Sequence, residues 1–146
     1  MRVHLGSDHA GFEMKEALKP YFERRGIELT DVGPDSDESV DYPEFAEKVA
    51  RGVADGDADL GVLICGSGIG MAIAANKVPG VRAATVTEPE LAKMSRQHND
   101  ANVIALGGRY IPRQTAEDIL DAFFDTEFEG GRHQRRVDEI ADLEQR

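Results

Sequence analysis

The chain has 146 residues, a single cysteine and a net charge of −11, with 40% hydrophobic residues. This length fits one domain that can bury a core, and one cysteine excludes an intrachain disulfide. The acidic balance argues against a nucleic-acid partner, because phosphates would be repelled. We find no signal-peptide pattern, and no stretch approaches the roughly 20 apolar residues of a membrane span, so we expect a soluble, cytoplasmic protein.

In the first half of the chain, short apolar runs alternate with helical patterns. The first strand is predicted at Arg2–Ser7 and the second at 27–32. Between them, apolar residues recur at helical spacing over 14–22, although Pro20 should kink or split that helix. After an acidic loop, Pro43 can open a second helix at its first position.

The second half repeats the alternation and contains the most apolar strand. Leu60–Cys65 is an almost pure apolar run, as expected of a strand that is covered on both faces. The glycines of 66–70 then turn the chain into a short helix that ends near Asn76. The remaining predicted elements are a strand at 82–86, a helix capped by Thr87 and reaching about Gln97, a strand at 103–106, a helix opened by Pro112, and a final helix over about 131–144.

Five strands that alternate with helices predict a single domain over 1–146. The architecture is a doubly wound α/β fold, a three-layer sandwich with a five-stranded parallel sheet. Ligands bind such sheets at the carboxyl ends of the strands. We therefore expect the site at the polar groups that follow the strands: Asp8 and His9, then Cys65 with 66–70, then Arg109.

The segment from Cys65 to Gly70 places free backbone N–H groups beside one thiol. A glycine-rich turn from a strand into a helix can hold a phosphate or a developing oxyanion. Met71 stands where the dinucleotide fingerprint needs a glycine and where a cysteine phosphatase needs an arginine, and the Gly-Lys pair of a nucleotide-hydrolase loop is absent. The loop therefore indicates a thiol beside an anion hole, where amides lower the pKa of thiols in general. An isolated cysteine would more often be a packing residue.

The other candidates each have a plainer interpretation. Asp8 can accept hydrogen bonds from sugar hydroxyls or cap the next helix, and His98 can handle a proton or only complement a helix dipole. Arg132 and Arg136 share a helical face and suit a phosphate, but they could form a solvated helix end. The four histidines show no close metal-ligand spacing, so we expect no metal.

Together these clusters resemble the type B ribose-5-phosphate isomerase family, which also includes the subunits of galactose-6-phosphate isomerase. The resemblance spans nearly the whole chain in the family's order. The matching segments are 6–12, 41–43, 65–71, 74–77, 98–102 and 132–136.

The resemblance implies a Rossmann-like or flavodoxin-like fold. It also implies an enzyme of the pentose phosphate pathway that interconverts ribose 5-phosphate and ribulose 5-phosphate through a cis-enediolate, without a cofactor. The protein would be a homodimer or homotetramer with a shared active site, and the C-terminal helix, about 131–144, would pack at the dimer interface.

The resemblance also assigns a role to each site residue. Cys65 removes and returns the proton on the carbon next to the carbonyl. One branch of the family uses a glutamate at the position of Met71 instead, so this chain falls in the cysteine branch. The remaining roles are ring opening by His98 with help from Asp8, proton handling by Ser67, enediolate stabilisation by the amides of Gly66, Gly68, Ile69 and Gly70, sugar contacts by Tyr42 and Asn99, and phosphate binding by His9, Arg109, Arg132 and Arg136.

Two alternatives stay open at this stage. The same mechanism can act on another sugar phosphate, such as allose 6-phosphate, galactose 6-phosphate or a tetrose phosphate. A non-catalytic module that binds a sugar phosphate or a nucleotide would keep the glycine loop and the arginines but would not need Cys65.

Overall fold

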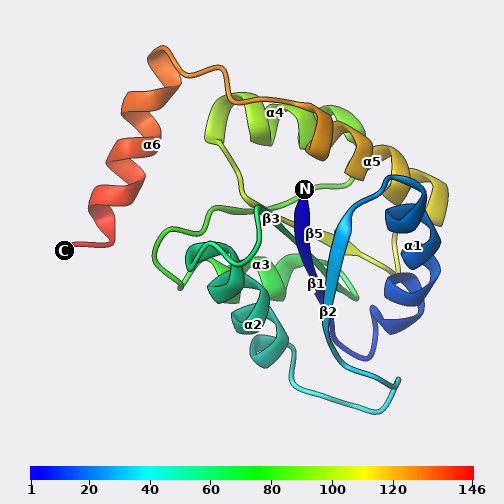
Figure 1. Ribbon diagram of the computed structural model, residues 1–146. Helices are drawn as coiled ribbons and strands as arrows, with labels where there is room; N and C mark the ends of the chain where they lie inside the picture. Colours follow the sequence, from blue (N-terminus) through cyan, green and yellow to red (C-terminus); the bar gives the residue numbers. More distant parts are fainter.

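The computed structural model describes residues 1–146 and contains five strands and six helices (Figure 1). Strands and helices alternate up to the end of the fifth strand, after which two helices follow one another. In chain order the elements are β1 (Arg2–Ser7), α1 (Phe12–Arg24), β2 (Glu28–Gly33), α2 (Tyr42–Ala54), β3 (Leu60–Cys65), α3 (Ile69–Ala75), β4 (Ala83–Thr85), α4 (Pro89–Asn99), β5 (Val103–Gly107), α5 (Arg113–Asp125) and α6 (Arg132–Leu143).

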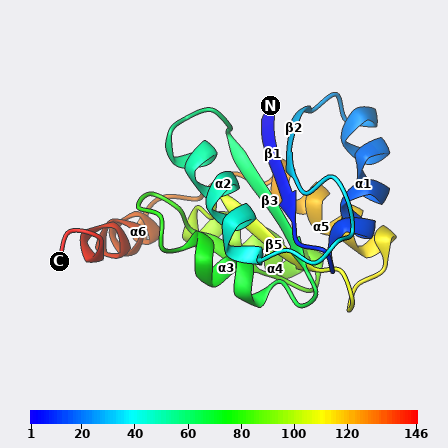
Figure 2. The ribbon, with the colours of Figure 1, turned by 90° about the horizontal axis from the view of Figure 1, so that it is seen from below.

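The strands form one parallel sheet with the order β2-β1-β3-β5-β4, which confirms the predicted doubly wound fold. The crossovers place helices on both faces of the sheet. Figure 2 shows α2 and α3 on one side of the strands and α1 and α5 on the other. The result is the expected three-layer sandwich.

Two apolar clusters fill the spaces between the layers. One cluster packs β1, β3 and β5 against α1, α4 and α5, and it includes Leu5, Ile64 and Phe123. The other packs the opposite face of the sheet against α2 and α3, and it includes Leu63 and Cys65. All six residues of β3 are buried, because this central strand is covered on both faces. Cys65 therefore ends the central strand, whose residues are all buried.

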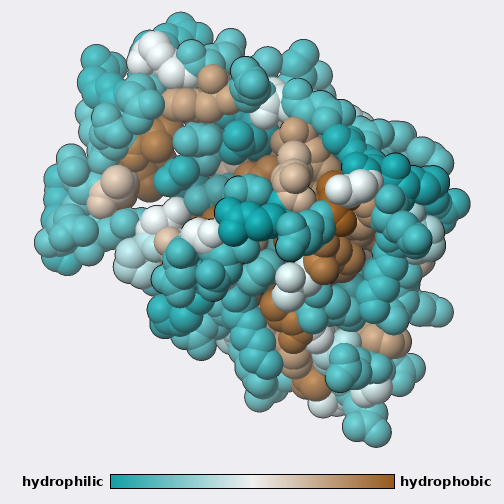
Figure 3. Space-filling model, in the orientation of Figure 1, coloured by the Kyte–Doolittle hydropathy of each residue, from teal (hydrophilic) through white to brown (hydrophobic).

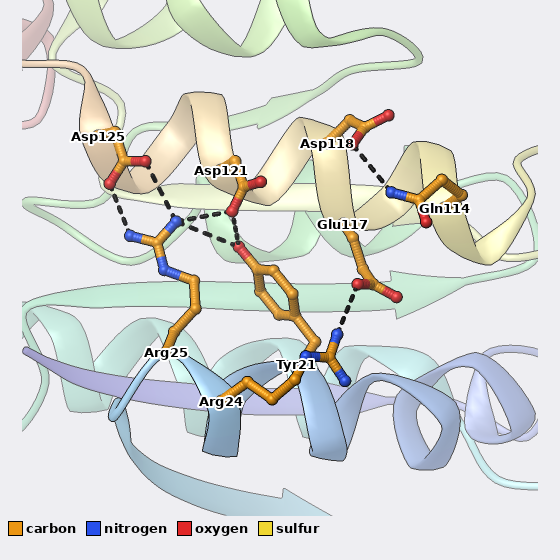
Figure 4. Close-up of polar contacts among 8 residues, drawn as sticks. All are labelled: Tyr21, Arg24, Arg25, Gln114, Glu117, Asp118, Asp121 and Asp125. Atoms are coloured by element: carbon orange, nitrogen blue, oxygen red, sulfur yellow. Dashed lines mark hydrogen bonds and ion pairs between the residues drawn. The ribbon is translucent and has the colours of Figure 1, made fainter.

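Helices α1 and α5 are also joined by polar side chains (Figure 4). The Tyr21 hydroxyl donates to Asp121 at 2.6 Å, and Arg25 pairs with both Asp121 and Asp125. One turn away, Arg24 pairs with Glu117 at 2.8 Å. Burial and the bond to Asp121 raise the pKa of Tyr21 well above its usual value. The tyrosine therefore stays a neutral donor that ties the two helices together.

Two details of the predicted helices differ in the structure. Helix α1 continues through Pro20 without a split, and the ring lies on the exposed side of the helix, where water can bind the carbonyl that loses its N–H partner. Thr87 does not cap α4. The cap position is Glu88, and Pro89 takes the first helical position, where a missing N–H has no consequence.

Helix α6 stands apart from the sheet (Figure 1). It contacts α4, and only His133 and Val137 among its residues are buried. Its bounds agree with the predicted final helix to within one residue at each end. No helix of the structure combines the length and the apolar character that a membrane crossing requires.

A buried ion pair links α1 to β2. The Lys15 side chain is only 1% exposed, and its Nζ lies 2.6 Å from Asp31 Oδ2, which Lys19 also approaches at 2.9 Å. Asp31 Oδ1 accepts a further bond from the Gly33 amide. Burial alone would raise the pKa of Asp31, but the bonds from Lys15, Lys19 and Gly33 outweigh it and hold this pKa below its usual value.

We expect Asp31→Asn to lower the free energy of unfolding by about 3 kcal/mol, because it leaves the buried Lys15 ammonium without its main partner. Lys15→Met should lower the free energy of unfolding by only about 1 kcal/mol. Asp31 keeps its ion pair with Lys19, and the methionine side chain fills the space of the lysine methylene groups. Urea unfolding at pH 7 measures both values.

The same pair predicts a pH dependence. Because folding lowers the pKa of Asp31, its contribution is present above pH 4 and is lost as the pH falls through the titration range of the carboxyl group. Asp31→Asn should therefore show a weaker loss of stability below about pH 4 than the native protein. Equal losses for the two variants at pH 7, or a greater loss for Lys15→Met, would contradict this account.

Candidate active site

A cavity of about 580 Å³ opens at the carboxyl ends of β1, β3 and β5. This volume is within the range of small-ligand sites. The polar groups that follow the three strands meet there, because parallel strands end at one edge of a sheet. The lining residues are Asp8, His9, Ala10, Tyr42, Cys65, Gly66, Ser67, Ile69, Gly70, Ile73, Arg109 and Tyr110.

Cys65 is 5% exposed and ends β3 at the wall of this cavity. The Gly68 amide donates a hydrogen bond to its Sγ at 3.0 Å, closing a turn over the thiol. This bond places a backbone donor on the sulfur just before the first turn of α3, an arrangement found at many reactive cysteines. The turn therefore suits a thiol that works as a base.

Two glycines allow this turn to lie against β5. Gly68 has φ +80°, and a Cβ there would also approach the Leu106 carbonyl carbon to 2.9 Å. A Cβ at Gly107 would come within 2.7 Å of the Ser67 carbonyl oxygen. Both positions need glycine, one for its backbone conformation and both for the close approach.

Asp8 and His9 follow β1 and have their orientations fixed by backbone amides. Asp8 Oδ1 accepts from Gly11 N at 2.9 Å, so this aspartate does bond the turn before α1, and its other oxygen has no protein partner. His9 Nδ1 accepts from Val40 N at 3.2 Å. An accepting Nδ1 carries no proton, so His9 donates through Nε2, as the binding of an anion requires.

The other walls of the cavity come from α2 and from the turn after β5. Tyr42 packs so closely on Gly70 that a Cβ there would lie 2.7 Å from the tyrosine ring. The Arg109 side chain lies against Gly66, where a Cβ would be 3.3 Å from Nη1. Arg109 makes no ion pair, so its guanidinium is free to bind an anion at a cavity whose lining carboxylate is that of Asp8.

Five of the predicted site residues do not line this cavity. Gly68 lies within the loop, with its amide on Cys65 Sγ, and the other four are His98, Asn99, Arg132 and Arg136. These four gather where the end of α4 meets the start of α6, on a different part of the molecule from the ends of the strands (Figure 1). The His98 ring stacks on His133, with centroids 4.5 Å apart. One chain thus presents two separate groups of predicted site residues.

His98, Glu129 and His133 are the side chains best placed to hold a metal ion. Their ligand atoms lie within 4.8 Å of one another, and Glu129 Oε1 is 3.7 Å from both Nε2 atoms. Partial burial, His98 and the Arg132 guanidinium lower the pKa of His133. The same positive surroundings, at the start of a helix, oppose a cation and favour an anion.

The sequence did not single out several residues of these two groups. Ala10, Ile73 and Tyr110 line the cavity, and Glu129 and His133 accompany His98. Tyr110 directly follows Arg109, so its place after β5 could have suggested it. No pattern in the sequence predicts the contact between His98 and His133, because 34 residues separate them and only the packing of α4 on α6 brings them together.

Comparisons with known proteins agree on one family. The model of the ribose/galactose isomerase family matches residues 3–140. The ribose-5-phosphate isomerase B of Escherichia coli K12 is 47% identical over 145 residues, which cover 99% of this chain and 97% of that protein.

Solved structures give the same result. The ribose-5-phosphate isomerase B of Clostridium thermocellum superposes with a TM-score of 0.98 at 48% identity, covering 99% of this chain and 98% of the other. The Mycoplasma genitalium enzyme, solved with bound ribulose-5-phosphate, has a TM-score of 0.93 and 42% identity, covering 99% and 96% of the two chains.

Proposed function

The chain belongs to the ribose/galactose isomerase family, and on this basis we propose that it interconverts ribose 5-phosphate and ribulose 5-phosphate. The observation that carries the proposal is the Cys65 thiol under the Gly68 amide, at a cavity that also holds an unpaired arginine. A similar protein binds ribulose-5-phosphate. We also propose that the reaction takes place in the cytoplasm, where a charged sugar phosphate is retained because it does not cross a bilayer unaided.

In the proposed reaction, the Cys65 thiolate removes the proton from carbon 2 of the open-chain aldose. The electron pair moves to the carbonyl oxygen at carbon 1 and forms a cis-enediolate. Backbone N–H groups of Gly66 to Gly70 stabilise the developing negative charge, with the Ser67 hydroxyl helping to move protons between the oxygens. Return of the proton to carbon 1 gives the ketose and regenerates the thiolate.

The phosphate end needs an anchor away from the reacting carbon. His9, donating through Nε2, and Arg109 supply two positive or donating groups from the chain that holds the thiol. Asp8 keeps one carboxylate oxygen for a sugar hydroxyl, and Tyr42 closes the side of the cavity. These residues form one half of the site in our proposal.

We propose that a second copy of the chain supplies the other half. His98 of that copy would open the sugar ring, Asn99 would contact the sugar, and Arg132 with Arg136 would complete the phosphate site. Four residues that line no part of their own chain's Cys65 cavity can act on its substrate only from another chain. The site would thus be shared in a homodimer, or in a homotetramer built from such dimers.

Exposed apolar side chains support such an assembly. On α3, at the cavity, Ile69 and Ile73 are 57% and 59% exposed, and on α6 Ile140 and Leu143 are also exposed. Figure 3, in the same orientation as Figure 1, shows an apolar patch on the side of the molecule where α6 lies. Apolar residues left in water on an otherwise hydrophilic helix indicate a partner. We therefore propose that α6 packs at the dimer interface.

The test of the function is an assay of the purified protein with ribose 5-phosphate, following ketose formation. We expect conversion without added metal or other cofactor, and slower conversion of allose 6-phosphate, galactose 6-phosphate and erythrose 4-phosphate. Faster conversion of one of these three would move the proposal to that substrate. A folded protein that binds ribose 5-phosphate and converts none of the four would be a binding module instead.

A further inference from the structure

Thr85, on the edge strand β4, makes a bond to the loop that carries the proposed base. Its hydroxyl Oγ1 donates to the carbonyl oxygen of Gly68 at 2.7 Å. The contact links residues 17 positions apart, from strand β4 to the turn between β3 and α3. Thr85 does not line the cavity, so it touches no substrate there.

Three carbonyl groups of the loop accept hydrogen bonds from the turn after β5 and from β4. The Cys65 carbonyl accepts from Gly108 N at 2.8 Å, and the Gly66 carbonyl accepts from Arg109 N at 3.2 Å. Both of those donors are backbone amides, whereas the donor to Gly68 is the hydroxyl of a side chain. This third bond is therefore the one that a substitution can remove without altering the backbone.

Gly68 is the point where such a bond has most effect. It adopts φ +80° and ψ −7°, and a glycine there has more freedom in the unrestrained chain than any other residue. Its amide donates to Cys65 Sγ, and its carbonyl belongs to the peptide whose other end is the Ile69 amide. That amide donates to Ser67 Oγ at 3.2 Å. Fixing the carbonyl therefore fixes both donors.

A carbonyl that accepts a bond also polarises its own peptide, which strengthens the N–H at the other end. The Thr85 hydroxyl thus strengthens the Ile69 amide as a donor by polarising its peptide group, and it orients the Gly68 amide by restraining the Gly68 backbone. Neither effect requires contact with a ligand.

We propose that Thr85 is a positioning residue for Cys65: its hydroxyl holds the Gly68 backbone so that the loop amides stay aimed at the thiol and at the oxyanion. The part of this inference that concerns turnover rests on the proposed isomerase function. The part that concerns the thiol does not, because the bonds among Thr85, Gly68 and Cys65 exist without substrate.

The test compares Thr85→Val, which keeps the shape but loses the hydroxyl, with Thr85→Ser, which keeps the hydroxyl. The first measurement is the rate of alkylation of Cys65, the only cysteine, by iodoacetamide from pH 5 to 10. For Thr85→Val we expect the pH of half-maximal alkylation rate to rise by about half a unit, which corresponds to the loss of one ordinary hydrogen bond. Thr85→Ser should retain the native profile.

The second measurement is turnover of the sugar phosphate. Thr85→Val should lower kcat about fivefold with KM unchanged, since the loop amides act on the oxyanion rather than on the bound ground state. Thr85→Ser should keep the native kcat. Because valine is favoured in strands, the variant should fold, and Thr85→Ala is a second hydroxyl-free variant if it does not.

Native alkylation profiles in both hydroxyl-free variants would overturn the proposal, and so would a serine variant that behaves like the valine variant. If the native protein converts no sugar phosphate, the function fails, but the alkylation profiles still decide the role of Thr85.

Discussion

Cys65→Ala should lower isomerisation about a thousandfold while leaving the protein folded and able to bind ribulose 5-phosphate. The thiol lies at the wall of the cavity, just before the start of α3, and accepts a hydrogen bond from the Gly68 amide. Met71, where a branch of the family places a glutamate, is fully buried and cannot take a proton. No second base stands at that position to replace the thiol.

Hydrogen exchange isolates the chemical step of this prediction. In deuterated water, the native protein should place deuterium on carbon 2 of ribose 5-phosphate, and Cys65→Ala should place almost none. Calorimetric titration with ribulose 5-phosphate checks that binding survives, and thermal unfolding checks the fold, since Cys65 also belongs to a core cluster. An active Cys65→Ala would exclude the proposed base. Loss of binding as well as exchange would give the cysteine a structural role.

Mixed assemblies should restore activity to two inactive variants. One variant is Cys65→Ala, and the other carries Arg132→Ala together with Arg136→Ala. In a shared site, a mixed dimer contains one site with both mutated halves and one site with neither. Random pairing of equal amounts makes half of the dimers mixed, so about a quarter of native activity should return, as two-fold symmetry requires.

The experiment unfolds the two variants together in urea, refolds them and measures isomerisation. Each variant refolded alone supplies the background, and native protein refolded alone supplies the yield. No recovery in the mixture would show that each chain builds its site from its own residues. A fully active protein that stays monomeric at micromolar concentration would also contradict the shared site.

The sequence was most informative about the sheet. An apolar run such as Leu60–Cys65 has few other interpretations, and the rule for parallel sheets then places the groups after β1, β3 and β5 at one edge. The sequence was least informative about where helices begin and end and about which helices pack against each other. The unbroken course of α1 through Pro20 could not be foreseen, because the spacing of apolar residues places the proline on the exposed side but does not say whether packing outweighs its missing N–H bond.

The division of the site into two groups was also beyond the pattern of residues. His98 ends one helix and Arg132 begins another, and periodicity does not say how far either lies from the ends of the strands. The resemblance to a family supplied the shared site as an expectation. The bond from Thr85 to Gly68 had no signal at all, since threonine in a strand is ordinary.

Because α6 is separate from the sheet, its sequence can be changed without disturbing the core around the sheet. Since only His133 and Val137 of this helix are buried within the chain, its other positions outside the proposed interface can be changed with little loss of folding stability. Residues on β3, buried along the whole strand, allow no such freedom. In the proposed shared site, a substrate of another length is therefore best accommodated by a new α6, which would change the phosphate contacts of the neighbouring molecule and leave β3 untouched.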